Sequence, residues 1–377
     1  MKILIAGDYC PRDRVLELIE QGRGTQIFDA SMLQLLSKTD YNIVNFECAV
    51  ADATVPGIKK CGPHLRCSDK AVQFLKESGF DCVTLANNHF RDYGDDGVRR
   101  TLAVLKAQGI DYVGGGENIA EACRILYKVI DGISIAIINV CENEFSIATE
   151  QRGGSAPIDI VDVCRRMKEA KGKAKYVIVI VHGGHEHWQY PSPRMKKWYR
   201  FFVENGADAV VNHHQHCYSG YEEYLGKPIF YGLGNFCFDH SKKRGSIWNE
   251  GYMVLMDIKD KGIGYDLIPY NQCDKSPTME LMTSSQKQTF NQIINFISKI
   301  IVDDKLLNEE WKNYVKKRSQ TVVTPFTPYL SGYARAASGR HWLPYLMPKK
   351  KVADMLNFIQ CEAHRDLLSL AMQNKLE

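Results

Sequence analysis

The sequence predicts a layered α/β domain in which helices cover both faces of a largely parallel sheet, followed by a C-terminal helical appendage. From residue 2 to about residue 258, short apolar runs alternate with stretches of helical periodicity. The run from Tyr176 to Val181 is apolar throughout and rich in β-branched residues, which is typical of a strand buried on both faces. Glycine also stands where several of the expected helices should end.

The elements follow from these patterns in chain order. Short apolar runs predict strands at residues 3–6, 42–46, 82–86, 133–140, 176–181, 209–211, 228–231 and 252–256. Helical spacing predicts helices at 69–78, 94–108, 159–171 and 193–205. Gly79, Gly109 and Gly206 lie at or just beyond the ends of three of these helices, where glycine adopts the left-handed backbone that closes a helix.

The pattern changes after about residue 270. Apolar residues from Phe290 to Val315 keep helical spacing, a proline-containing loop is expected at 325–348, and an amphipathic helix is expected at 352–370. The aromatic segment 329–345 is either a lid over a site or a loop packed between helices. We therefore expect a domain at 1–270 and a helical appendage at 271–377 packed on it.

Composition excludes several functional classes. The chain has 377 residues, and its 48 Lys and Arg against 44 Asp and Glu leave a net charge of +4, too slight to indicate a nucleic-acid partner. No apolar run reaches the ~18 residues of a membrane-spanning helix, so we expect no membrane insertion. The first strand begins at once, which favours a cytoplasmic protein. The twelve cysteines are scattered without a CxxC pair, as in a protein with reduced thiols.

Polar residues gather at the carboxyl ends of the expected strands, where α/β sheets bind their ligands. More than half of the eleven histidines lie between residues 182 and 216, at two consecutive strand ends. Taken singly, each polar residue also fits a helix cap or a structural side chain. Their clustering favours a metal or substrate-polarising site, because imidazole and oxygen ligands suit Zn, Mn, Fe or Ni.

Several motifs carry a resemblance to a known family. They are Gly7-Asp8, Asn45-Phe46-Glu47, Asn87-Asn88-His89 with Asp92, His182-Gly183-Gly184 with Glu186, His213-His214-Gln215-His216, and Gly232-Leu233-Gly234-Asn235-Phe236. In this order, over about residues 2–258, the chain resembles the CapA family of capsule and poly-γ-glutamate synthesis proteins. That family is similar to a branch of the calcineurin-like metallophosphoesterases. The resemblance implies a four-layer α/β/β/α sandwich and a site for divalent metals.

The resemblance also implies a role for each matching residue. His89 matches the histidine that protonates a leaving oxygen, and Asp92 and Glu186 are expected either to support the site residues or to act on the substrate. Glu47 takes the place of the carboxylate that bridges two metals. The expected metal ligands are Asp8, Glu47, Asn88, His182, His214 and His216.

One departure from the phosphoesterase pattern predicts unequal metal binding. Cys10 stands where those enzymes have a histidine, so the ion held by Asp8, His216 and Glu47 lacks a ligand unless the thiol supplies it. We expect one firmly held divalent ion (Mn, Zn or Fe) on a complete set and a second position that is weak or empty. A site without any metal is the alternative. The complete set is Glu47, Asn88, His182 and His214.

Three functions remain open at this point. The first is a metal-dependent, hydrolase-like enzyme that modifies capsule, poly-γ-glutamate or peptide, for example by phosphoester hydrolysis. The second is a non-catalytic binding or scaffold subunit of a polymer-synthesis machine. The third is a metal-independent acid/base enzyme of the epimerase type on the same fold, with His89, Asp92, Glu186 or Cys10 as bases. The expected partner is a peptide, poly-glutamate or glycan-type substrate, with no nucleic acid.

Overall fold

The computed structural model describes residues 1–60, 62–323 and 332–343, without side chains at 318–323. The chain forms two compact units, Met1–Leu307 and Asn308–Glu377. Among the described helices, none combines the length and apolar character needed to cross a bilayer.

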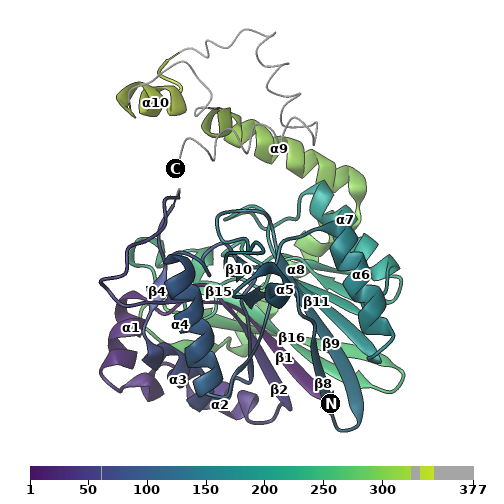
Figure 1. Cartoon of the computed structure of the whole chain (residues 1–377). Helices are drawn as coiled ribbons and strands as arrows, with labels where there is room; N and C mark the ends of the chain where they lie inside the picture. The colour runs from purple at the N-terminus through teal and green to yellow at the C-terminus, as the bar shows by residue number, and fades with distance from the viewer. Residues whose placement is uncertain (61, 324–331, 344–377) are drawn as a thin grey trace. The chain divides into compact units, whose positions relative to one another are not determined.

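The first unit is built on two large sheets (Figure 1). The seven-stranded sheet has the order β17-β16-β15-β1-β2-β5-β6, with β1, β2, β5 and β6 parallel to one another and β15, β16 and β17 joined by antiparallel pairing. Its strands are β1 (Lys2–Tyr9), β2 (Tyr41–Phe46), β5 (Cys82–Thr84), β6 (Asp111–Val113), β15 (Glu250–Lys259), β16 (Gly262–Gln272) and β17 (Met279–Leu281).

The six-stranded sheet has the order β13-β14-β12-β11-β9-β8. Its inner strands are parallel, and β8 and β13 close its edges with antiparallel pairing. The strands are β8 (Leu126–Ile130), β9 (Ile133–Cys141), β11 (Tyr176–His182), β12 (Ala209–His213), β13 (Tyr221–Tyr224) and β14 (Lys227–Phe230). Two short ribbons pair β3 (Ala49–Val50) with β4 (Arg66–Cys67) and β7 (Gly115–Gly116) with β10 (Gly154–Ser155).

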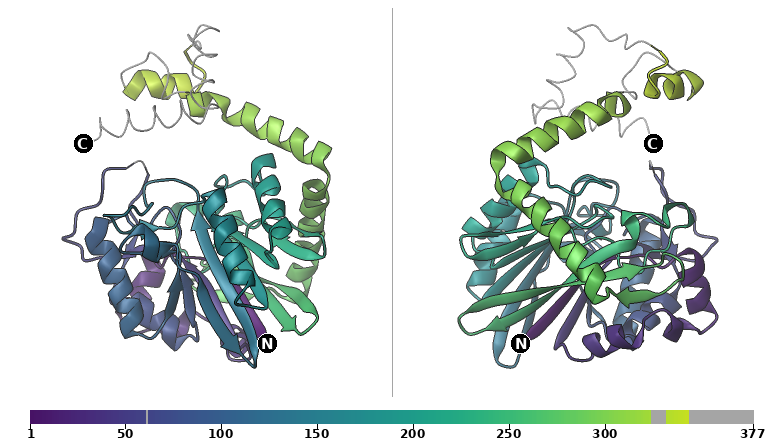
Figure 2. Two further views of the ribbon diagram at one scale, coloured as in Figure 1. Left: turned by 45° about the vertical axis from the view of Figure 1, so that its right-hand side comes forward. Right: turned by 180° about the vertical axis from the view of Figure 1, so that it is seen from behind.

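Helices cover the outer faces of the two sheets, which gives the four layers α/β/β/α (Figures 1 and 2). Between the sheets, Ile3 and Ile5 of β1 share one buried core with Ile135 and Ile137 of β9. The opposite face of β1, including Leu4, belongs to a second core under α1 (Asp13–Glu20), α2 (Ala30–Leu36), α3 (Asp69–Glu77) and α4 (Gly94–Ala107). The six-stranded sheet is covered by α6 (Ile160–Lys171) and α7 (Pro193–Glu204). Successive side chains of β1 therefore enter the two cores in turn. Burial of both faces stabilises the seven-stranded sheet.

Most elements match their expected positions, and the differences have local reasons. All eight expected strands and all four expected helices are present with end shifts of a few residues. The strand β16 and the helices α1 and α2 were not expected. Helix α8 (Ser284–Val302) belongs to the first unit, where it packs against β13 and places Phe290 beside Tyr218 and Tyr252. The division of the chain at residue 270 stays a prediction.

The C-terminal part contains α9 (Asp304–Val323), which crosses the boundary of the two units, and α10 (Gly332–Gly339). The prediction of a loop at 325–348 is wrong for residues 332–339. This segment, Gly-Tyr-Ala-Arg-Ala-Ala-Ser-Gly, forms a helix. The helix expected at 352–370 lies outside the described residues. The remaining elements are α5 (Ile119–Ala122) and the 3-10 helices η1 (Gly24–Gln26), η2 (Ser241–Lys243) and η3 (Ile247–Asn249).

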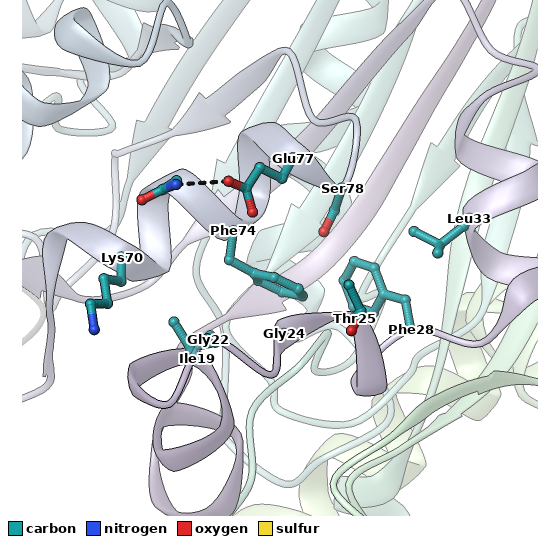
Figure 3. A pocket seen from close by; sticks show the side chains of 11 residues that line it. Ile19, Gly22, Gly24, Thr25, Phe28, Leu33, Lys70, Phe74, Glu77 and Ser78 are labelled. Atoms are coloured by element: carbon teal, nitrogen blue, oxygen red, sulfur yellow. Dashed lines mark hydrogen bonds between the residues drawn. The ribbon is translucent and has the colours of Figure 1, made fainter.

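A cavity of about 350 Å³ lies within the helical layer, between α1, η1, α2 and α3 (Figure 3). Ile19, Phe28 and Phe74 form its apolar wall, and Lys70 and Glu77 stand at its rim. None of the residues expected in the functional site lines this cavity.

Candidate metal centre

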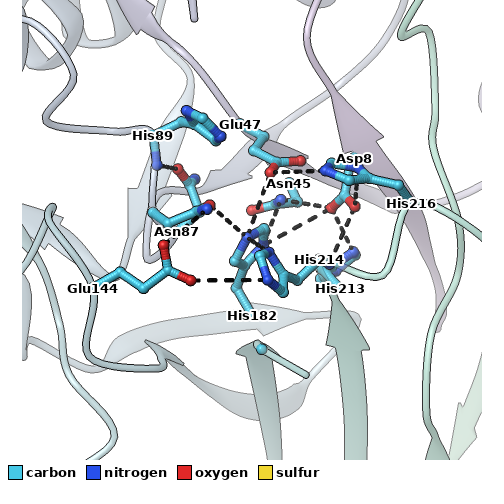
Figure 4. Close-up of polar contacts among 12 residues, drawn as sticks. Asp8, Asn45, Glu47, Asn87, His89, Glu144, His182, His213, His214 and His216 are labelled. Carbon is cyan, nitrogen blue, oxygen red and sulfur yellow. Dashed lines mark hydrogen bonds and ion pairs between the residues drawn. The ribbon is translucent and has the colours of Figure 1, made fainter. Parts of the chain in front are cut away.

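The polar residues expected at the strand ends lie together at one edge, where carboxyl ends of both sheets meet (Figure 4). Asp8 and Glu47 come from the ends of β1 and β2, and Asn88 follows β5. The second sheet contributes His182 from the end of β11, and His214 and His216 from the segment after β12. All six side chains are buried. The structure brings the six together; their assignment as metal ligands stays a prediction.

Three potential ligand atoms lie close to the imidazole of His182. Its Nε2 lies 3.0 Å from Nδ1 of His214 and 3.1 Å from Oδ1 of Asn88. It also lies 3.5 Å from Oε1 of Glu47. An ion bound tetrahedrally by bonds of ~2.1 Å keeps its ligand atoms ~3.4 Å apart, so these spacings fit a first-row divalent ion.

A second group shares Glu47 with the first. Oε1 of Glu47 lies 3.7 Å from Nε2 of His216, whose Nδ1 lies 3.8 Å from Oδ2 of Asp8. Asp8, Glu47 and His216 form one group of potential metal ligands, and Glu47, His182 and His214 form another. Cys10 belongs to neither group; its thiol lies in the apolar core, within hydrogen-bonding reach of Cys48.

The carboxylate of Glu47 lacks a conventional partner. Both oxygens are buried, and among the described residues neither has a hydrogen-bond partner. Burial, followed by the charge of Asp8, raises the pKa of Glu47 well above its usual value. A buried carboxylate without a partner is costly, and an adjacent cation would satisfy both oxygens. The donor set therefore fits a divalent metal.

Asp8 has a different environment. Its Oδ1 accepts a hydrogen bond from Nδ2 of Asn45 at 2.7 Å, and its Oδ2 accepts one from the backbone N–H of His214 at 3.2 Å. Burial alone would raise the pKa of Asp8, but the hydrogen bond and charge of His213, aided by His216 and Asn45, hold this pKa below its usual value. Asp8 is therefore an anion at neutral pH, as a metal ligand must be.

Two imidazoles of the centre, those of His182 and His216, are held neutral. Burial and the neighbouring histidines lower the pKa of His182 well below its usual value, and burial lowers the pKa of His216 to about 4. Neutral imidazole is the form that binds metals. His214 and His216 have positive φ angles of 94° and 55°, unusual for residues with a side chain, and such strain is common at functional sites.

His89 lies beside the centre in a chain of three charged or polar groups. Its Nδ1 lies 2.7 Å from Oδ2 of Asp92, and Oδ1 of Asp92 contacts the ammonium group of Lys60. That ammonium also lies 3.2 Å from Nδ1 of His89. The Lys60 side chain is only 2% exposed and that of Asp92 is fully buried. Burial lowers the pKa of His89, while Asp92 opposes the shift.

Replacing Lys60 by methionine is expected to lower the free energy of unfolding by about 3–5 kcal/mol, because it leaves the buried Asp92 carboxylate without its cation. Denaturant unfolding measures the change. Lys70 is the matched control, since its exposed ammonium lies 3.5 Å from Glu20 and Lys70→Met should cost less than about 1 kcal/mol. Equal effects of the two substitutions would contradict the role of Lys60.

Glu186 lies at the edge of this cluster: burial alone would raise its pKa, but electrostatic interactions with His216, His214 and nearby histidines lower it. Its side chain is 48% exposed and lies 3.8 Å from Nε2 of His187 at the rim of the site. Among the described residues, no hydrogen bond or ion pair joins Glu186 to His89 or Asp92, so a role on the substrate stays a prediction.

Sequence reasoning missed four residues of the site. Asn45 bridges Asp8 and His182, and His213 lies 3.4 Å from Asp8. Glu144 lies 3.3 Å from Nδ2 of Asn88 and 4.0 Å from Nε2 of His214. Glu144 follows β9, so the strand-end rule that identified the other residues would have identified it too. Lys60 gives no local signal.

Four layers, with histidines, carboxylates and a carboxamide at the carboxyl ends of both sheets, define a two-sheet α/β protein with one buried polar centre. A family model described as bacterial capsule synthesis protein PGA_cap matches residues 2–240. The chain belongs to this family.

Two relatives in sequence show the same family. The chain is 30% identical over 319 residues to a capsule biosynthesis protein CapA of Bacillus anthracis, covering 81% of this chain and 77% of the relative. It is 29% identical over 280 residues to a PGA biosynthesis protein CapA of Bacillus subtilis (strain 168), covering 73% of each. A solved structure described as a novel phosphatase of Mycoplasma pneumoniae has a TM-score of 0.45 at 14% identity, covering 73% of this chain and 95% of that one.

Proposed function

We propose that this protein is a metal-dependent, hydrolase-like enzyme that modifies a capsule, poly-γ-glutamate or peptide substrate. The observation that carries the proposal is the Glu47 carboxylate. Both of its oxygens are buried without a hydrogen-bond partner among the described residues, and Oε1 lies within 3.7 Å of imidazole nitrogens of His182 and His216. A structural carboxylate would be paired, whereas a metal-bridging carboxylate is paired by its metal.

The geometry favours one firmly held ion. Glu47, Asn88 and His214 supply donor atoms at 3.0–3.5 Å from Nε2 of His182, which is itself the fourth donor. The other group has only Asp8, Glu47 and His216, since Cys10 lies in the core. Mn, Zn and Fe each fit imidazole and oxygen ligands. When bound, such an ion supplies Lewis-acid polarisation of a substrate oxygen.

The chain's own residues supply the proton transfer. His89 is placed to protonate a leaving oxygen, and its Nδ1 is held by Asp92 at 2.7 Å. Because Asp92 also contacts Lys60 and accepts a hydrogen bond from the backbone N–H of Leu65 at 2.7 Å, its carboxylate is fixed from several sides. This support orients the imidazole for general acid catalysis. We place phosphoester hydrolysis first among the reactions that this arrangement can perform.

The substrate class follows from the relatives. The two CapA proteins are described as acting in capsule or PGA biosynthesis, and another relative, from Mycobacterium tuberculosis, as a probable polyglutamine synthesis accessory protein. We extend this to a peptide, poly-glutamate or glycan-type substrate for the present chain. Its cytoplasmic location stays a prediction.

A scaffold subunit is the second candidate, favoured by the position of Cys10 in the core, which leaves one ligand group a donor short. The same position weakens the epimerase-type alternative, since Cys10 cannot then act as a base on a substrate. Neither alternative requires the donor atoms around His182 to bind a metal ion.

Activity tests separate these readings. Protein loaded with Mn, Zn or Fe is assayed against phosphomonoesters, phosphodiesters, nucleotides and γ-glutamyl peptides. We expect turnover of at least one class of substrate, and we expect His214→Ala to abolish it. Chelation should abolish the turnover of the native protein, and added metal should restore it. Absence of turnover with the metal bound would remove the hydrolase proposal and favour the scaffold.

A further inference from the structure

The segment Gly232–Phe236 lies directly beside Asp8, although the expected ligand set does not include it. The backbone N–H of Asp8 donates to Gly234 O at 3.1 Å, and the N–H of Phe236 donates to Asp8 O at 2.7 Å. A Cβ atom at Gly7 would lie 2.0 Å from Gly234 O, so this close approach requires glycine in β1. Asn235 is thereby held at the carboxyl end of β1, opposite Asp8.

The hydrogen bonds of Asn235 fix the orientation of its buried side-chain amide. Nδ2 donates to two backbone carbonyl oxygens, His216 O at 3.1 Å and Trp248 O at 3.3 Å. Carbonyl oxygens only accept hydrogen bonds, so the amino group must face them and Oδ1 must face the other way. Oδ1 then lies 2.9 Å from Nδ1 of His216.

This orientation determines where the His216 imidazole carries its proton. An amide oxygen can only accept, so Nδ1 of His216 must be the donor. In a neutral imidazole the other nitrogen, Nε2, then carries the lone pair. Nε2 is the atom that lies 3.7 Å from Oε1 of Glu47.

We propose that Asn235 is a positioning residue of the metal centre, which fixes His216 as the Nδ1–H tautomer and directs the Nε2 lone pair toward the ion shared by Asp8 and Glu47. This inference rests on the proposed metal site. It assigns a task to the Gly-Leu-Gly-Asn-Phe motif: its backbone lies against one ligand, Asp8, while its side chain orients another, His216. The set around His182 does not contact Asn235 in the hydrogen bonds of the described residues.

Two variants distinguish an orienting role from a structural one. Asn235→Asp keeps an acceptor for Nδ1–H but loses both donors to the carbonyl oxygens, whereas Asn235→Leu loses both functions at similar volume. If Asn235 orients His216, the ion held by Asp8, Glu47 and His216 should bind ~10–100-fold more weakly in the leucine variant, the size typical of outer hydrogen-bond partners of metal ligands. The aspartate variant should keep most of that affinity. If Asn235 only holds the two carbonyl groups, aspartate should be at least as harmful as leucine.

Stepwise Mn²⁺ titration of chelator-treated protein, followed by calorimetry, measures both binding steps. The first step, on the His182 set, should be unchanged and serves as an internal control. Asn249→Leu is a matched control, because Asn249 is also buried but donates to Gln272 O at 2.8 Å rather than facing an imidazole. If the native protein shows no first Mn²⁺-binding step, the proposed metal site is overturned. A normal first step with an unaltered second step in Asn235→Leu would overturn only the role of Asn235.

Nitrogen NMR of the native, metal-free protein tests the inference even if the variants do not fold. With ¹⁵N-labelled histidine and His216 assigned through His216→Gln, we expect a protonated Nδ1 and an unprotonated Nε2. A protonated Nε2 with a bare Nδ1 would contradict the proposal.

Discussion

Glu47→Gln is expected to abolish tight metal binding while leaving the metal-free protein as stable as before or more stable. Glu47 belongs to both ligand groups, so the substitution removes the carboxylate charge from each and leaves only a neutral amide oxygen. We expect the affinity for Mn²⁺ to fall by more than ~100-fold, beyond the ~10–100-fold typical of outer partners. In the metal-free protein the substitution removes a buried carboxylate without a partner, a group whose burial costs about 1–3 kcal/mol or more.

These opposite signs distinguish a metal ligand from a structural residue. Thermal unfolding with and without Mn²⁺ measures both effects on one sample. Glu223→Gln, on the exposed side of β13, is the control and should retain the stabilisation by metal. A Glu47→Gln protein that is destabilised without metal and still stabilised by Mn²⁺ would show that Glu47 has a structural partner and no ion.

His89→Asn is expected to lower turnover by ~10²–10⁴-fold, the contribution typical of a general acid. The metal content should not change, because His89 belongs to neither ligand group. Its imidazole is supported by Asp92 and Lys60 and lies next in sequence to Asn88, a position suited to a proton donor at the edge of the centre.

The assay uses whichever substrate class shows turnover, with metal content measured on the same preparation. His64→Gln, at an exposed histidine outside both ligand groups, is the control and should keep full activity. Unaltered turnover in His89→Asn would exclude His89 as the acid. A loss of turnover accompanied by a loss of metal would instead give His89 a structural role in the centre.

Periodicity and composition predicted the strands that carry the site because those strands are buried on both faces and therefore read as continuous apolar runs. β11 is the clearest case, buried along its whole length. β16 escaped because most of its eleven residues are exposed or partly exposed, so they form no continuous apolar run, and because it includes Pro269. The short helices α1 and α2, of eight and seven residues, offer too few turns for a reliable helical period.

The site was predictable to the extent that its residues lie at or just after strand ends. The fold brings together six residues that lie at the end of a strand or within four residues after it: Asp8, Glu47, Asn88, His182, His214 and His216. Lys60 comes from the connection between β3 and β4, and only its tertiary contact with Asp92 shows its importance. The exposed position of Glu186 depends on how the segment after β11 turns, and spacing alone does not specify that turn.

The metal content of native protein, purified without a histidine tag and combined with anomalous diffraction, tests the central claim most directly. We predict about one ion per chain, with an anomalous peak among Glu47, Asn88, His182 and His214 and a weak or absent peak beside Asp8 and His216. Two tightly held ions would contradict the unequal occupancy inferred from Cys10. Metal-replete protein without any ion at these residues would contradict the metal centre itself.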